Sequence, residues 1–379
     1  MITIRSGSYV HQLLTLLSVA GEYPTSSLNI LGNERVVKAL VHRLESVQDV
    51  RKENETTVYS TKLLTVSGSR ETRTVRLYKG ALPILNELHP DALGYYLYSF
   101  HDHKFSGDEY HMWRNHRVGE ALAMGMMAGI EIRGYVLPKL QMTEIRRTVP
   151  NHPSFYIARD FKKLDTAEFN KTMFTRIVGA IFYPGGVYAV YNTREAVMKW
   201  SGLGEFKAAQ HLLDLSRMNA GINEVSSALL FGKSHDIVLK TLIESDRSRR
   251  LELRFDRIYP HVHFLPLDQN GVRLLRILTL PDWNEKLLSA LFAPEMRPQG
   301  YGFMEYDAYW ENRYIYSHLD SDIARLIRFR QALETQKNGR FEVICFPWQA
   351  GFLREYLGER VTLKQIEMAS LEAALGIMA

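Results

Sequence analysis

The strongest constraint in the sequence is the apolar spacing of residues 33–47, NERVVKALVHRLESV. Apolar side chains recur here at intervals of three and four residues, which predicts a helix with one buried face. The residues of that face are Val36, Val37, Leu40, Val41 and Leu44. The intervening positions carry polar and mostly basic side chains, so the outward face of this helix is expected to be basic.

The segments before and after this helix predict further elements of the same domain. Residues 9–20 have the same apolar periodicity, and residues 24–27, PTSS, supply a break and a helix start. Residues 50–59 and 62–67 are β-prone and are broken by the polar run 51–55, which predicts a hairpin with its tip at that run. These segments follow the order of a winged helix-turn-helix: two helices, a turn, a basic helix and a hairpin. We therefore predict such a domain over residues 1–80.

Such a domain predicts binding to double-stranded DNA, because a helix can enter the major groove while a hairpin reaches neighbouring phosphates. Residues 1–80 hold eleven Lys and Arg against seven Asp and Glu, a balance of +4 out of +5 for the whole chain. The predicted DNA contacts are Ser26, Ser27, Asn33, Arg35, Lys38, His42 and Arg43, with Arg51 and Lys52 from the hairpin. The alternative is a domain of this shape that binds only protein.

Composition narrows the class of protein further. The single cysteine, Cys345, excludes a disulfide framework and a cysteine-based zinc finger. No segment reaches the roughly 20 apolar residues of a membrane helix, and the first residues, MITIRSGSYVHQ, lack the apolar core of a signal peptide. We therefore expect a cytoplasmic protein with no membrane partner.

The pattern of the remaining residues predicts an α/β protein (α+β overall). Residues 81–132 are expected to form a helical connector that includes a long helix at 107–129. Residues 176–183 and 187–191, separated by Pro-Gly-Gly, predict a hairpin in an α/β domain of residues 133–220. From residue 228 onward strands and helices alternate, which predicts a C-terminal α/β domain over 221–379 with a mainly parallel sheet.

Two of these segments carry a family resemblance. The long helix with Arg114-Asn115-His116-Arg117, ending in Ala128-Gly129, and the hairpin RIVGAIFYPGGVYAVYNTR (176–194) follow the predicted winged helix. In this order they resemble the replication-relaxation family of Firmicute plasmids and integrative conjugative elements, over about residues 8–290. The resemblance implies a winged helix followed by an α/β region with nuclease-like or Rossmann-like topology. It also implies a role in plasmid replication, DNA relaxation or mobilisation, or in the regulation of these processes.

The chain differs from the family pattern at the two strands of this hairpin. Many members of the family place acidic residues there, whereas this chain has no carboxylate at the corresponding positions. They are occupied by Gly179, Ala180, Tyr188, Tyr191 and Asn192. We therefore expect the α/β region to be catalytically silent, with no cofactor and no metal, and to serve dimerisation or docking of relaxosome or replication proteins.

The competing hypothesis is a metal-dependent nicking enzyme. His261 and His263 alternate on a predicted strand, as in HUH endonucleases, where paired imidazoles hold a divalent metal. A tyrosine would then attack the phosphodiester, with Tyr309, Tyr314 and Tyr316 as the candidates. The chain also contains Glu205-x-Lys207, a motif that restriction-type nucleases use on a strand to hold a metal. Its surroundings here have the apolar spacing of a helix, which argues against a nuclease site at these residues. A third hypothesis is a protein-interaction adaptor of the conjugation machinery.

Some clusters of charged residues outside the winged helix also have the composition of a binding site. The basic ones, which we expect to lie on solvated faces or to follow phosphates, are Arg146-Arg147, Lys162-Lys163, Arg247 to Arg250, Arg254 and Arg257. The histidine-rich set His101, His103, Glu109, His111 and His116 has poor spacing for zinc, so no metal is predicted there.

Overall fold

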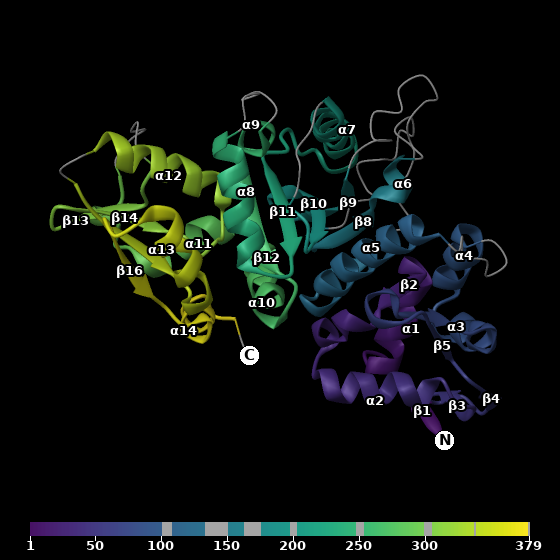
Figure 1. Ribbon diagram of the computed structural model, residues 1–379. Coiled ribbons are helices and arrows are strands. Elements are labelled where there is room, and N and C mark those ends of the chain that lie inside the picture. The colour runs from purple at the N-terminus through teal and green to yellow at the C-terminus, as the bar shows by residue number, and fades with distance from the viewer. Residues whose placement is uncertain are drawn as a thin grey trace.

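The computed structural model describes residues 1–100, 108–132, 151–162, 176–197, 203–247, 254–298, 305–336 and 339–377 (Figure 1). The chain is mixed α/β, which confirms the predicted class. Within these residues no helix has the length and apolar character needed to cross a bilayer.

The N-terminal module, residues 1–77, contains two small sheets and two α-helices. Its helices are α1 (Tyr9–Ala20) and α2 (Glu34–Leu44), joined through β2 (Glu22–Pro24) and a 3-10 segment, η1 (Thr25–Leu31). One sheet has the antiparallel order β2-β6-β5, with β5 (Leu64–Ser67) and β6 (Thr74–Leu77). The other has the order β1-β3-β4, with β1 (Ile2–Ile4), β3 (Gln48–Lys52) and β4 (Tyr59–Thr61).

The hairpins of this module differ from the predicted one. β3 and β4 pair as a hairpin around the polar run, as expected, but residues 64–67 do not join them. They pair instead with β6, from Leu64 opposite Leu77 to Ser67 opposite Thr74, which buries Leu64, Val75 and Leu77 together. The module therefore has a second hairpin, with residues 68–73 at its tip.

The long helix α5 (Glu109–Met127) lies between the N-terminal module and the central sheet, as Figure 1 shows. It follows α3 (Leu82–Leu88) and α4 (Pro90–Ser99) and agrees with the predicted helix 107–129. Gly119 makes the close approach to the module possible, because a Cβ there would lie 3.0 Å from the carbonyl oxygen of Glu22. The run 121–125, ALAMG, is fully buried on both sides of the helix.

The central sheet has six strands in the order β12-β11-β10-β9-β8-β7. Their bounds are β7 (Glu131–Ile132), β8 (Ser154–Ile157), β9 (Ile177–Tyr183), β10 (Gly186–Arg194), β11 (Ser227–Gly232) and β12 (His261–Pro266). The predicted hairpin is confirmed as β9 and β10, and β10, β11 and β12 run parallel. The sheet crosses the predicted domain boundary at 220/221, because β11 and β12 continue it.

Side chains alternate between two cores along these strands. One face, with Val190, Leu229 and Leu265, packs on α5 and α10 (Gln269–Leu278). The opposite face, with Ala189, Leu230 and Phe264, packs on α7 (Leu203–Ala220), α8 (His235–Arg247) and α12 (Ile323–Thr335). Period-two burial on both faces is what a sheet covered by helices on each side requires.

The C-terminal part holds a second sheet in the order β13-β14-β15-β16. Its elements are β13 (Ala308–Trp310), β14 (Arg313–Ser317), β15 (Arg340–Cys345), α13 (Ala350–Leu357), β16 (Val361–Gln365) and α14 (Met368–Ala374), with α9 (Phe255–Ile258) and α11 (Trp283–Leu291) preceding them. Two strands expected within the alternating pattern, at 251–255 and 302–306, were wrong where the chain is described: Phe255 begins helix α9, and residues 305–306 lie outside any strand. Residues 251–253 and 302–304 lie outside the described residues.

Candidate nucleic-acid interface

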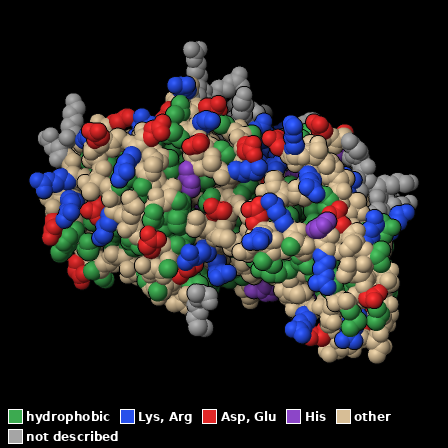
Figure 2. Space-filling model, turned by 60° about the horizontal axis from the view of Figure 1, so that its bottom comes forward, with side chains coloured by type: hydrophobic (Ala, Val, Ile, Leu, Met, Phe, Trp, Pro, Cys, Tyr) green, Lys and Arg blue, Asp and Glu red, His purple; other side chains and the backbone are tan. Residues whose placement is uncertain are grey.

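Helix α2 presents a basic face to solvent. Four exposed side chains on it carry positive charge or gain it on protonation: Arg35, Lys38, His42 and Arg43. Val37, Val41 and Leu44 anchor the opposite face in the core, whereas Val36, predicted to be buried, is 51% exposed. Figure 2 shows the module as the lobe at the lower right, with basic side chains on its surface.

The start of this helix is fixed by its cap. Asn33 Oδ1 accepts the backbone N–H groups of Arg35 at 3.1 Å and Val36 at 3.3 Å. Lys38 Nζ lies 2.5 Å from the carboxylate of Glu34, one turn earlier, and both side chains are more than half exposed. A surface pair of this kind contributes little to stability, so Lys38 can exchange Glu34 for another anion at small cost.

Two predicted contacts need correction or qualification. Ser27 is 3% exposed, and its hydroxyl donates to Glu120 Oε1 at 2.6 Å, so it has no access to DNA in this structure. Ser26 is exposed at the start of η1. Asn33 is also exposed, but its side-chain oxygen is engaged by the cap. The spacing of residues 24–27 could not distinguish an outward serine from a buried one.

The predicted wing residues lie in β3 rather than at a free tip. Arg51 Nε donates to Thr3 Oγ1 at 3.4 Å, and Lys52 Nζ donates to the carbonyl oxygen of Glu87 at 2.8 Å. The exposed tip of the β5–β6 hairpin carries Arg70 and Arg73 instead. Sequence reasoning missed this tip, although Gly68, which has φ +80°, is a turn signal between β-prone segments.

A buried polar cluster joins the module to α5 and to the end of β10. Glu120 is fully buried and accepts hydrogen bonds at both carboxylate oxygens, from Ser27, from Arg194 Nε at 3.0 Å and from Asn192 Nδ2 at 2.9 Å. The guanidinium of Arg194 also lies 4.8 Å from the ring centre of Trp113. Glu120 therefore links η1, α5 and β10 in one ion-paired network.

A second part of this cluster lies along β2 and β6. Glu22 pairs with Arg76 and accepts from Asn115 Nδ2 at 2.8 Å. His116 Nε2 lies 2.7 Å from Thr74 Oγ1, and burial together with Arg194 lowers the pKa of His116 to about 3. His116 is therefore neutral at physiological pH, and the contacts of α5 with the module depend on hydrogen bonds rather than on its charge.

The two histidines of the nicking hypothesis lie beside a pair of buried aspartates. Ligand atoms of His263, Asp320 and Asp322 lie within 4.8 Å of one another, which makes this a metal candidate. Every carboxylate is already engaged, however. Asp322 Oδ1 accepts three backbone N–H groups and its Oδ2 lies 2.7 Å from His261 Nδ1, while Asp320 Oδ2 lies 3.5 Å from the guanidinium of Arg325. This cluster holds β12 against the start of α12.

The candidate tyrosines do not form a reactive group with these histidines. Tyr316 is fully buried, its hydroxyl donates to the carbonyl oxygen of Asp322 at 3.3 Å, and burial raises its pKa well above the ordinary value. Tyr309 is 41% exposed and donates to Asn312, and Tyr314 stacks on Phe341. A nucleophile needs a phenol that ionises readily, which the surroundings of Tyr316 oppose.

The pH dependence of this cluster is a testable prediction. A hydrogen bond to Asp322 raises the pKa of His261 above 6.5, so the protonated imidazole stabilises the fold below pH 6.5 and that contribution is lost as the pH rises through the raised pKa. His261→Gln should therefore lower the thermal midpoint more at pH 6 than at pH 9, measured by circular dichroism. An equal effect at both pH values would contradict the ion pair.

The other residues singled out in the sequence differ in where they lie in the structure. Glu205 and Lys207 lie on helix α7, as their helical spacing predicted, and Glu205 Oε1 accepts the backbone N–H of Arg176. His111 bonds only to Asp108 among the contacts described, and His116 is buried. Arg254 is paired with Asp256, whereas Arg257 is exposed. Residues 101–103, 146–147, 163, 249 and 250 lie outside the described residues, as does the side chain of Lys162.

Comparisons of the chain with family models, with curated proteins and with solved structures find no match. The resemblance to the replication-relaxation family therefore stays a prediction, and the function has to be argued from geometry.

Proposed function

We propose that the chain binds double-stranded DNA through its N-terminal module, with α2 in the major groove. The observation that carries this proposal is the outward face of α2, on which Arg35, Lys38, His42 and Arg43 lie exposed while the helix is capped and anchored from behind. Arg and Lys on such a helix can reach both phosphates and guanine edges.

The topology of the module supports the proposal. The order α1, β2, η1, α2, β5 and β6, with the sheet order β2-β6-β5, is the order of a winged helix, with a 3-10 segment in place of its second helix. In that comparison the β5–β6 hairpin corresponds to the wing, and the exposed Arg70 and Arg73 at its tip are the proposed phosphate contacts. Strands β3 and β4, which form a sheet with the N-terminal β1, are inserted between α2 and the wing.

The setting we propose is a cytoplasmic DNA-binding protein of a mobile element, acting in its replication, mobilisation or regulation. This part rests on the resemblance of residues 8–290 alone. Association of two copies, or docking of replication or relaxosome proteins on the α/β region, belongs to the same proposal.

Incubation of supercoiled plasmid with the protein and Mg²⁺ or Mn²⁺ separates binding from nicking. We expect retarded but intact plasmid on a native gel and no protein-linked strand on a denaturing gel, because protein groups already engage both carboxylates of the histidine–aspartate cluster and Tyr316 is buried. Nicked circles that carry covalently attached protein, and that disappear in His263→Ala, would overturn the proposal in favour of a nickase. Plasmid that is neither retarded nor nicked would leave the adaptor hypothesis.

A further inference from the structure

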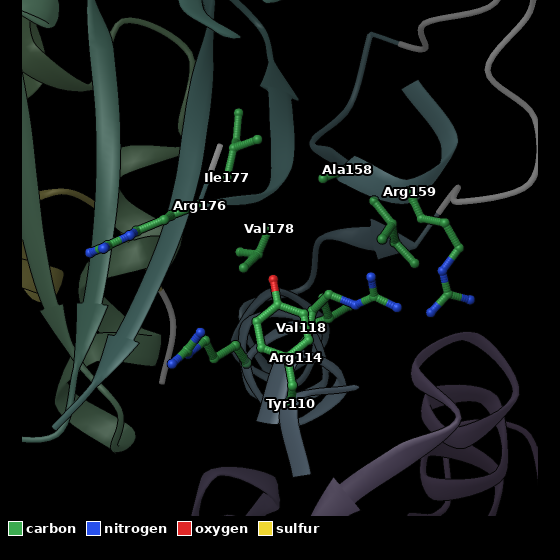
Figure 3. A pocket seen from close by; sticks show the side chains of 10 residues that line it. Tyr110, Arg114, Val118, Ala158, Arg159, Arg176, Ile177 and Val178 are labelled. Atoms are coloured by element: carbon green, nitrogen blue, oxygen red, sulfur yellow. The ribbon is translucent and has the colours of Figure 1, made fainter. Parts of the chain in front are cut away.

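A cavity of about 310 Å³ opens beside the N-terminal half of α5, between β8 with the start of α6 (Ala158–Lys162) and the beginning of β9 (Figure 3). Four arginines line it: Arg114 and Arg117 from α5, Arg159 from α6 and Arg176 next to β9. These positions are distant in sequence, so only the folded chain brings the four guanidinium groups to one cavity. Its volume lies at the small end of the range typical of ligand sites.

No carboxylate lines this cavity among the described residues. The acidic side chains near the cavity have other contacts. Both Asp160 oxygens accept from the hydroxyl of Tyr95 at 3.2 Å, and Glu205 accepts the backbone N–H of Arg176. Asp108 pairs with His111, and Glu120 pairs with Arg194. None of the four arginines forms an ion pair with a described residue. The cavity is therefore strongly cationic, which favours an anionic ligand.

Two guanidinium nitrogens at this site are buried without a hydrogen-bond acceptor within the described chain, Arg117 Nε and Arg159 Nη1. Burial lowers the pKa of Arg114 and of Arg117, and neighbouring arginines lower both further. Buried donors without acceptors and like charges held together both destabilise a fold. Groups kept at such a cost are typical of functional sites.

The remainder of the lining is apolar. Val118, Ile157 and Val178 line the cavity between the arginines, and the ring of Tyr110, which is 73% exposed, borders it. In Figure 3 Arg114 and Arg159 lie on one side of Tyr110 and Val178, and Arg176 extends on the other side. A ligand that fits this arrangement carries a flat ring for the apolar centre and phosphate groups for the arginines.

We propose that this cavity is a binding site for a small nucleoside phosphate, with the base against Val118, Ile157 and Val178 and phosphate oxygens on Arg114 and Arg159 or on Arg117 and Arg176. Guanidinium groups bind phosphate oxygens in pairs of parallel hydrogen bonds, which gives such a site both affinity and orientation. The site is separate from the outward face of α2, so it goes beyond the proposed DNA contact.

Isothermal titration of the full chain tests this proposal with four probes. They are a nucleoside 5′-monophosphate, a nucleoside 3′,5′-bisphosphate, the unphosphorylated nucleoside and inorganic pyrophosphate. We expect the two nucleotides to bind, and the nucleoside and pyrophosphate to bind at least about tenfold more weakly, because each lacks one of the two recognition elements. Pyrophosphate binding as tightly as the nucleotides would overturn the role of the apolar centre.

Variants locate the binding. Of Arg114→Gln and Arg176→Gln, the variant that removes an arginine of the pair holding the phosphate should weaken binding of the nucleoside 5′-monophosphate by about tenfold to a hundredfold. If neither variant weakens it, the phosphate is not held by these arginines and the proposal is overturned. Arg340→Gln, at an exposed position at the start of β15, is the matched control and should leave nucleotide binding unchanged. Duplex DNA binding by Arg114→Gln should stay at the wild-type level, which separates failure of this proposal from failure of the DNA-binding one.

Thermal stability gives an independent measurement. Without ligand, Arg114→Gln should keep or raise the thermal midpoint, because it removes a like charge from the cluster. A lowered midpoint without any nucleotide binding by the wild type would make the arginines structural and overturn the proposal. Binding of a single-stranded oligonucleotide but of no mononucleotide would also overturn it, assigning the cavity to a DNA strand.

Discussion

Replacing Arg35, Lys38 and Arg43 together by alanine is expected to weaken binding of duplex DNA by at least about a hundredfold. Each basic side chain that contacts a base edge or phosphate contributes about 1 kcal/mol or more, and three such losses amount to about 3 kcal/mol. All three side chains are exposed, so the fold should not change. Fluorescence anisotropy of a labelled duplex at fixed salt measures the loss.

The salt dependence of the same titration distinguishes contact from general charge. The slope of log affinity against log salt should fall by about 0.9 for each phosphate contact removed. Lys286→Ala, at an exposed position on α11, removes a positive charge elsewhere and should change neither slope nor affinity appreciably. Equal weakening by this control and by the triple variant would mean that DNA does not select the α2 face.

The largest expected effect on stability is at Glu120. Glu120→Ala should lower the free energy of unfolding by about 3–5 kcal/mol, because it leaves the buried Arg194 without its carboxylate. It also removes the acceptor of Ser27 and Asn192, which ties the N-terminal module to β10. Urea denaturation followed by circular dichroism measures the change.

Two comparisons make the Glu120 result specific. Arg194→Ala should cost less than Glu120→Ala, since Glu120 keeps its hydrogen bonds from Ser27 and Asn192. Glu359→Ala, at an exposed position, should leave stability within about 0.5 kcal/mol of wild type. If Glu120→Ala were as mild as this surface control, the buried cluster would not hold the module to α5.

Features set by local sequence were the ones that could be predicted. Helix α2 follows from its apolar periodicity, and the β9–β10 hairpin follows from Pro184, Gly185 and Gly186 between two β-prone runs. In both cases neighbouring residues determine the element, so the expectation and the structure agree.

Pairings between distant residues could not be predicted in this way. β5 is adjacent in sequence to β4, yet it pairs with β6, because that register buries Leu64 against Leu77. Ser27 resembled an exposed capping residue, but its partner Glu120 is 93 residues away. The four arginines of the cavity come from three separate segments, so no sequence motif predicts that they lie together.

Affinity cleavage from position 39 tests the central claim most directly. Ala39 is exposed within the basic face of α2, and the only natural cysteine, Cys345, is buried, with its pKa raised by burial to about 11. An iron chelate attached to the thiol of Ala39→Cys should therefore be site-specific. We expect cuts confined to about one helical turn of a bound duplex, as for a helix in one major groove. Cleavage no greater than from the same reagent on Ser370→Cys, on α14, would contradict DNA binding through α2.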